Sequence, residues 1–216
     1  MNNSKLFQYA VCLLAVFTVV SCAPKKQALE RNHYLLETSR QGQPAQQSPP
    51  LVLAVRDFSV SPGYQGREII YRTGKNIART DFYNHYFVLP GPMIARLSGS
   101  WIRDSGIFAS VIPLSSHKEA DYLLEGAVKS LYADLQNPEE PRAVAEINFL
   151  LLRNTEVSFE VAFQKKYRSE TEMKGREADF FIEALNKGLA DILSALERDM
   201  AAALADSRDR VNVHEG

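Results

Sequence analysis

Three long runs of alternating apolar and polar residues occupy the middle of the chain, at residues 120–135, 143–152 and 156–166. Alternation with a period of two places successive side chains on opposite faces of a β-strand. Residues 153–155 are few enough to form a hairpin turn between the last two runs. The runs therefore predict a sheet with one buried face. The apolar residues of the third run are expected on that face: Val157, Phe159, Val161 and Phe163.

Shorter apolar runs place further strands before these three. Residues 51–60 open with the continuous run Leu-Val-Leu-Ala-Val, which is typical of a strand buried on both faces. A polar, proline-bearing linker covers residues 41–50, and we expect a strand before it to join the sheet across it. That first strand and three others are predicted at residues 33–38, 68–73, 81–89 and 107–112.

Two helices complete the pattern. Proline suits the first turn of a helix, so a helix is predicted from Pro92 to Asp104, with Gly106 as its stop. Its apolar residues recur every four positions: Met93, Leu97 and Trp101. A second amphipathic helix is predicted at residues 176–204. The charged residues 206–216 are expected to form a disordered tail.

The composition favours a single globular domain. Hydrophobic residues make up 45% of the 216 residues and charged residues 24%, which is typical of a chain that buries a core. We therefore predict an α/β domain over residues 34–205, with a mixed sheet of about six or seven strands and two main helices packed on it. The net charge of −1 argues against nucleic-acid binding, which requires a basic surface.

The predicted strand at residues 81–89 is unusually rich in aromatic side chains, namely Phe82, Tyr83, Tyr86 and Phe87. Large rings bury a large apolar area and usually enter the core. We interpret this run as core with one exposed ring. A lipid-contacting site is the alternative.

The N-terminus carries the pattern of a bacterial lipoprotein. Lys5 precedes a mostly apolar run at residues 6–20, which a small residue and then Cys22 follow. Fifteen helical residues span about 22 Å, which is too short for a bilayer crossing. The pattern predicts a signal peptide at residues 1–21, lipidation of Cys22 and a tether at residues 22–33. An ordinary signal peptide or a short uncleaved anchor are the alternatives.

Patterns for catalysis, metal binding or cofactor binding are missing from the sequence. The four histidines have no second ligand at metal-site spacing, and neither a nucleophile elbow nor a phosphate-binding loop occurs. Cys12 would leave with the signal peptide, so the mature chain would contain no disulfide. We therefore expect no enzyme, no catalytic residues, no metal and no cofactor.

Several short segments resemble the ABC-type transport auxiliary lipoprotein family. They are Tyr34-Leu35-Leu36, then Leu51-Val52-Leu53-Ala54-Val55, then the most specific one, Val60-x3-Tyr64-x2-Arg67-x-Ile69-Ile70-x-Arg72. The resemblance extends over nearly the whole mature chain. Two segments depart from the family pattern. They are Gln65-Gly66, where Leu-Asp is expected, and Pro90-Gly91-Pro92 at the start of the first helix.

The resemblance implies a non-enzymatic outer-membrane lipoprotein that faces the periplasm and assists a transporter. Its expected partners are an MCE-domain protein and ABC transporter components that move lipids or hydrophobic compounds between the membranes. Tyr64, Arg67 and Arg72 become candidate partner-binding residues, although a structural turn is the other interpretation of residues 64–67. The residue after Cys22 is alanine, not the aspartate that retains lipoproteins at the inner membrane of enteric bacteria. A ring-shaped homo-oligomer of this chain would also match a partner that forms hexameric tubes. The rival functions are a regulator of a cell-wall enzyme and a periplasmic lipid carrier.

Overall fold

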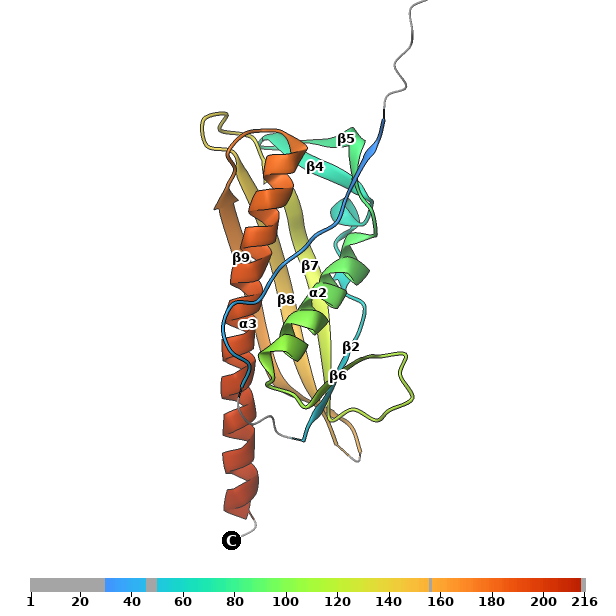
Figure 1. Ribbon diagram of the computed structural model, residues 1–216, viewed down its shortest axis with the longest axis vertical. Helices are drawn as coiled ribbons and strands as arrows, with labels where there is room; N and C mark the ends of the chain where they lie inside the picture. Colours follow the sequence, from blue (N-terminus) through green and yellow to red (C-terminus); the bar gives the residue numbers. More distant parts are fainter. Residues whose placement is uncertain (1–29, 46–49, 156, 215–216) are drawn as a thin grey trace, which may run out of the picture. The chain divides into compact units, whose positions relative to one another are not determined.

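The computed structural model describes residues 30–45, 50–155 and 157–214. The predicted signal peptide, Cys22 and most of the predicted tether lie outside these residues. Within the compact unit that begins at Arg31, a mixed β-sheet packs against two helices (Figure 1). This arrangement confirms the predicted α/β class.

The described residues contain nine strands, more than the six or seven predicted. The strands are β1 (Asn32–Tyr34), β2 (Val52–Val55), β3 (Ser59–Val60), β4 (Glu68–Gly74), β5 (Ile77–Tyr86), β6 (Ser110–Pro113), β7 (Tyr122–Asp134), β8 (Arg142–Asn154) and β9 (Phe159–Glu172). The helices are the 3₁₀ turn η1 (Pro62–Tyr64), α2 (Pro90–Ser105) and α3 (Ala178–His214).

Strand β7 organises the sheet. One of its edges pairs antiparallel with β8, which in turn pairs antiparallel with β9. Its other edge pairs in parallel with β2, β3 and β4, which lie along successive parts of it. Strand β6 lies outside β2, whereas β5 and then β1 lie outside β4. The β1–β5–β4 group and the β2–β6 group therefore lie at opposite ends of β7.

Both helices cover the same face of the sheet (Figure 1). Helix α3 packs on β8 and β9, and α2 packs on β2, β3, β6 and β7. A side chain at Gly188 of α3 would lie 2.7 Å from the Ser169 hydroxyl of β9, so the glycine allows a close approach. The Tyr167 hydroxyl donates to Asp199 of α3 over 2.5 Å. The core lies between this face and the helices, and no described helix covers the opposite face.

Helix α2 begins two residues before its predicted start. Pro90 occupies the first helical turn, where an amide hydrogen has no partner inside the helix, so proline is tolerated there as it is at Pro92. The helix ends at Gly106 as predicted, in the left-handed conformation with a φ of 71°. A side chain at Gly106 would also contact Ala45.

The predicted strand at residues 51–60 is two strands, since β2 ends at Val55 and β3 begins at Ser59. Strand β2 lies between β6 and β7 with its first three residues buried, in agreement with its continuous apolar run. The first strand joins the sheet as expected, through parallel pairing with β5, but it ends at Tyr34. Helix α3 runs to His214, beyond the predicted end at Leu204, because residues 205–214 contain no glycine or proline.

The prediction that Val157, Phe159 and Val161 face the core is wrong. All three are exposed, and only Phe163 packs partly against the core. A β-bulge shifts the pairing of β8 with β9, because Ala162 of β9 is an extra residue opposite the step from Leu151 to Leu152. A shift of one residue exchanges the two faces of a strand, so the apolar residues before the bulge face away from the helices.

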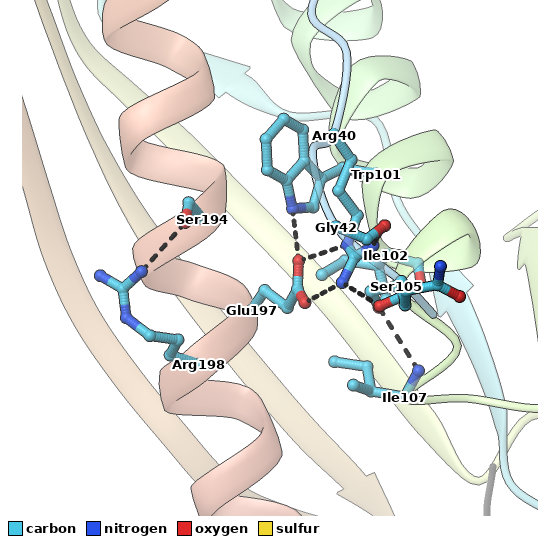
Figure 2. Close-up of polar contacts among 10 residues, drawn as sticks. Arg40, Gly42, Trp101, Ile102, Ser105, Ile107, Ser194, Glu197 and Arg198 are labelled. Carbon is cyan, nitrogen blue, oxygen red and sulfur yellow. Dashed lines mark hydrogen bonds and ion pairs between the residues drawn. The ribbon is translucent and has the colours of Figure 1, made fainter. Parts of the chain in front are cut away.

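The segment between β1 and β2 forms a strap that crosses both helices. We use this name for residues 35–45. The Glu37 amide donates to the Asn186 side chain of α3 over 3.1 Å, and the Ala45 amide donates to the Ser105 carbonyl of α2 over 2.8 Å. Between these points, Arg40 forms a two-pronged ion pair with Glu197 of α3, as Figure 2 shows. The strap therefore ties the N-terminal end of the unit to both helices.

Candidate docking surface

The helix-free face of the sheet carries a cluster built from the segment that resembles the lipoprotein family. The Tyr64 ring stacks on the Tyr132 ring with centroids 6.0 Å apart and planes 16° apart. The Arg72 guanidinium lies 5.3 Å from the centre of the Tyr132 ring and donates to its hydroxyl over 3.1 Å. Tyr132 is buried beneath these neighbours. Stacking and cation–π contacts therefore join η1, β4 and β7.

Charged side chains surround this aromatic cluster. Arg168 of β9 pairs with Glu146 of β8 over 3.1 Å and with Glu170 over 2.7 Å. Arg142 lies 3.8 Å from Glu170, which extends the row of alternating charges. Exposed ion pairs of this kind contribute little stability, so their main effect is to present a patterned polar surface.

The structure places the three predicted partner-binding residues differently. Tyr64 and Arg72 meet at Tyr132, and Arg72 also donates to the Lys75 carbonyl over 3.2 Å. Arg67 is exposed, and its own carbonyl accepts a 2.6 Å hydrogen bond from the Tyr86 amide. Burial raises the pKa of Tyr64, so its hydroxyl stays protonated at neutral pH. Partner binding by these residues remains a prediction.

Two side chains donate hydrogen bonds to backbone carbonyls around the turn at residues 64–67 and the end of β4. The Gln65 side chain donates to the Val60 carbonyl over 3.0 Å, and Arg72 performs the same task at Lys75. Gln65 belongs to one of the two departures from the family pattern. The departure from the family's Leu-Asp therefore lies where the amide side chain of Gln65 forms a hydrogen bond within the turn.

Tyr132 and Arg168 are members of this surface that the sequence pattern did not identify. The alternation of Tyr122 and Leu124 on one face of β7 would place Tyr132 on the core side. A bulge between Val128 and Ser130 exchanges the faces, so Tyr132 points away from the helices. No local sequence signal marks the position of that bulge.

An apolar patch lies on the same face at the β2–β6 end of the sheet. Leu114, Phe159 and Val161 are exposed there, and Phe159 and Leu114 line a cavity of about 220 Å³. This patch is distinct from the aromatic and charged cluster, which lies near the β4 end of β7.

In the described part of the chain, no group of three acidic, histidine or cysteine side chains is arranged to hold a metal ion. None of the helices described is long and apolar enough to cross a membrane.

Two of the solved structures that are similar to this chain have TM-scores above 0.6. One is a Xanthomonas campestris protein of the DUF330 family, which is 16% identical, with a TM-score of 0.70 and a match that covers 82% of this chain and 99% of that one. The other is an uncharacterised protein, which is 13% identical, with a TM-score of 0.62 and coverage of 79% and 99%. At such identities the likeness shows a shared fold alone. No family model and no curated protein matches the chain.

Proposed function

We propose that this chain is a periplasm-facing lipoprotein of the outer membrane that assists an MCE and ABC-type transporter of lipids or hydrophobic compounds. Its role is docking, and it carries no reaction of its own. The observation that carries the proposal is the cluster of Tyr64, Tyr132 and Arg72. The segment with the most specific family resemblance contributes two of these side chains to a helix-free sheet face.

The mechanism follows from tethering. Acyl chains on Cys22 hold the domain at the membrane, and ten residues of the tether extend over at most about 33–36 Å. A partner that spans the periplasm meets the helix-free face at a high effective concentration, so weak polar and aromatic contacts suffice. A homo-oligomer would multiply these contacts.

Crosslinking in cells tests the partner. A photo-reactive amino acid replaces Arg67, which is exposed directly before β4, and a control replaces Asp191, which is exposed on α3. We expect an MCE or ABC component to crosslink from position 67 and not from position 191. Recovery of a peptidoglycan synthase would support the cell-wall regulator instead, and recovery of neither partner would refute the proposal.

The anchor has a separate test. The Cys22→Ala variant should lose incorporation of radioactive palmitate, and continued labelling would remove the lipoprotein assignment. This result is independent of the crosslinked partner.

A lipid carrier is the second candidate, and one cavity favours it. A hollow of about 380 Å³ lies between α2 and the strands β2 and β6, with Arg96 and Arg103 in its lining. Its size falls in the range of about 300–1,000 Å³ that is usual for ligand pockets. Phospholipid that co-purifies with the protein in a one-to-one ratio would support the carrier over the docking role.

A further inference from the structure

Three large aromatic rings are exposed on β5 and at the residue that follows it, which overturns the expectation of one. Phe82 is 64% exposed, Phe87 57% and Tyr83 39%, whereas only Tyr86 of this run is buried. Leu35 and Leu89, at the ends of the adjoining segments, are also exposed. Large exposed apolar patches on proteins mark contacts with another molecule or a membrane.

Basic and imidazole side chains accompany these rings. The Arg31 guanidinium lies 4.9 Å from the centre of the Phe82 ring, and Phe82 contacts Tyr83 edge to face at 5.1 Å. His33 of β1 stacks on His85 at 6.1 Å and meets Phe87 at 6.2 Å. Aromatic rings beside cationic groups are typical of protein surfaces that lie at the headgroup level of a membrane.

The exposed rings belong to a rigid part of the fold. The Asp81 carboxylate accepts hydrogen bonds from the Tyr71 hydroxyl over 2.7 Å and from the Tyr83 amide over 2.8 Å. Asn84 donates to Asp81 through both its backbone amide and its side-chain amide. The Tyr34 hydroxyl donates to Asp179 of α3 over 2.6 Å, which fixes β1. These hydrogen bonds fix the backbone of β5 at Tyr83 and Asn84, next to Phe82, and they join β1 to α3.

Chain length identifies the occupant of this surface. Arg31 is nine residues after Cys22, and nine extended residues span at most about 32 Å. The acylated cysteine therefore keeps the β1–β5 end close to the bilayer. The apolar patch around Val161 lies toward the other end of β7, whose thirteen residues extend about 43 Å.

We infer that the β1–β5 end is a second membrane contact, in which Phe82, Tyr83 and Phe87 insert among phospholipid headgroups. This inference rests on the proposed anchoring of Cys22. The acylated Cys22 alone attaches the chain to the membrane at one point. The inserted rings would also fix the orientation of the domain relative to the membrane. The helix-free face would then be held at a constant angle to the membrane for its periplasmic partner.

Fluorescence quenching by brominated phospholipids tests this contact. The full chain is expressed so that it is lipidated, and is reconstituted into phosphatidylethanolamine and phosphatidylglycerol vesicles. A single cysteine, Tyr83→Cys or Val161→Cys in a Cys12→Ser background, carries an environment-sensitive dye. Val161 is a matched position because it is also apolar and 63% exposed. We expect brominated lipid to quench the dye at position 83 and to leave emission at position 161 unchanged.

A double variant shows whether the rings cause the contact. Phe82→Ser with Phe87→Ser should abolish quenching at position 83, whereas the control pair Leu114→Ser with Phe159→Ser should leave it intact. Persistence of quenching in the first pair would overturn the inference.

Vesicle flotation separates the two proposals. Flotation of the protein with an unquenched label at position 83 would overturn the membrane contact alone. Failure of the protein to float would overturn both the contact and the anchor on which it rests.

Discussion

The ion pair that fastens the strap to α3 should be among the most sensitive points of the fold. The Glu197 carboxylate accepts from Arg40 Nε over 2.9 Å and from Arg40 Nη2 over 2.8 Å. It also accepts from the Trp101 indole over 2.8 Å, which brings in α2 (Figure 2). The side chains of Arg40 and Glu197 are only 11% and 19% exposed. One carboxylate thus joins the strap and both helices.

The Glu197→Ala variant leaves a mostly buried guanidinium and an indole N–H without their acceptor. Removal of one partner of a buried pair costs about 3–5 kcal/mol. Arg40 keeps its hydrogen bonds to the Gly42 and Gln43 carbonyls, so we expect the lower end, about 3 kcal/mol. For a domain of this size that loss lowers Tm by roughly 6–12 °C.

Urea unfolding followed by circular dichroism measures the free energy of unfolding. Arg198→Ala is the matched control, because Arg198 is exposed on the same helix and donates a hydrogen bond to Ser194 four residues earlier (Figure 2). Its expected cost is within about 0.5 kcal/mol. If Glu197→Ala destabilised no more than Arg198→Ala, the strap would not be fastened by this pair. The double variant Arg40→Met with Glu197→Met should recover much of the loss, because apolar groups need no partner.

The remaining predictions concern pH and packing. Burial alone would raise the pKa of Glu197, but hydrogen bonds from Arg40 and Trp101 outweigh it and hold the pKa below its ordinary value. The stabilisation that the ionised Glu197 contributes is therefore complete above about pH 4.3 and is lost as the pH falls through the lowered pKa. In Glu197→Gln, the free energy of unfolding measured in urea should therefore decline less steeply at acid pH. Gly91→Ala should lower the free energy of unfolding by more than about 1 kcal/mol, because its methyl group would lie 2.3 Å from the Phe58 carbonyl oxygen. Gly99→Ala should raise it by up to about 1 kcal/mol, because the nearest atom, in the Val55 side chain, is 3.6 Å away. Equal effects of the two variants would contradict this packing. Tyr132→Phe removes the hydroxyl that accepts from Arg72 and should cost about 1 kcal/mol in thermal unfolding, and an unchanged Tm would contradict that role.

Much of the fold was predictable because its signals are local. The stop of α2 at Gly106 needs only a residue that tolerates the left-handed conformation. The burial of β2 follows from an apolar run that suits both faces of a strand. The existence of long strands at residues 122–134 and 142–154 follows from a period of two.

The surface was less predictable because bulges control it. A single extra residue in β7 moves Tyr132 to the helix-free face, and another in the β8–β9 pairing exposes Val161. Each bulge exchanges the two faces of a strand, and its position depends on how that strand aligns with another one. The residue types near the bulge give no signal that would predict it. The exposed rings of β5 and of Phe87 have a similar origin, since β1 is the last strand beside β5 and none of the described elements covers that edge.

The sequence by itself determined the elements of this protein, its α/β class and the candidate anchor at Cys22, since each depends on residues that are neighbours along the chain. Only the tertiary structure decided which face of each strand is covered. It brought Tyr64, Arg72 and Tyr132 together, and it left the rings of Phe82 and Phe87 outside. The physical reason is that a side chain is buried by elements far away in sequence, and their register is settled by the packing of the whole sheet against α2 and α3.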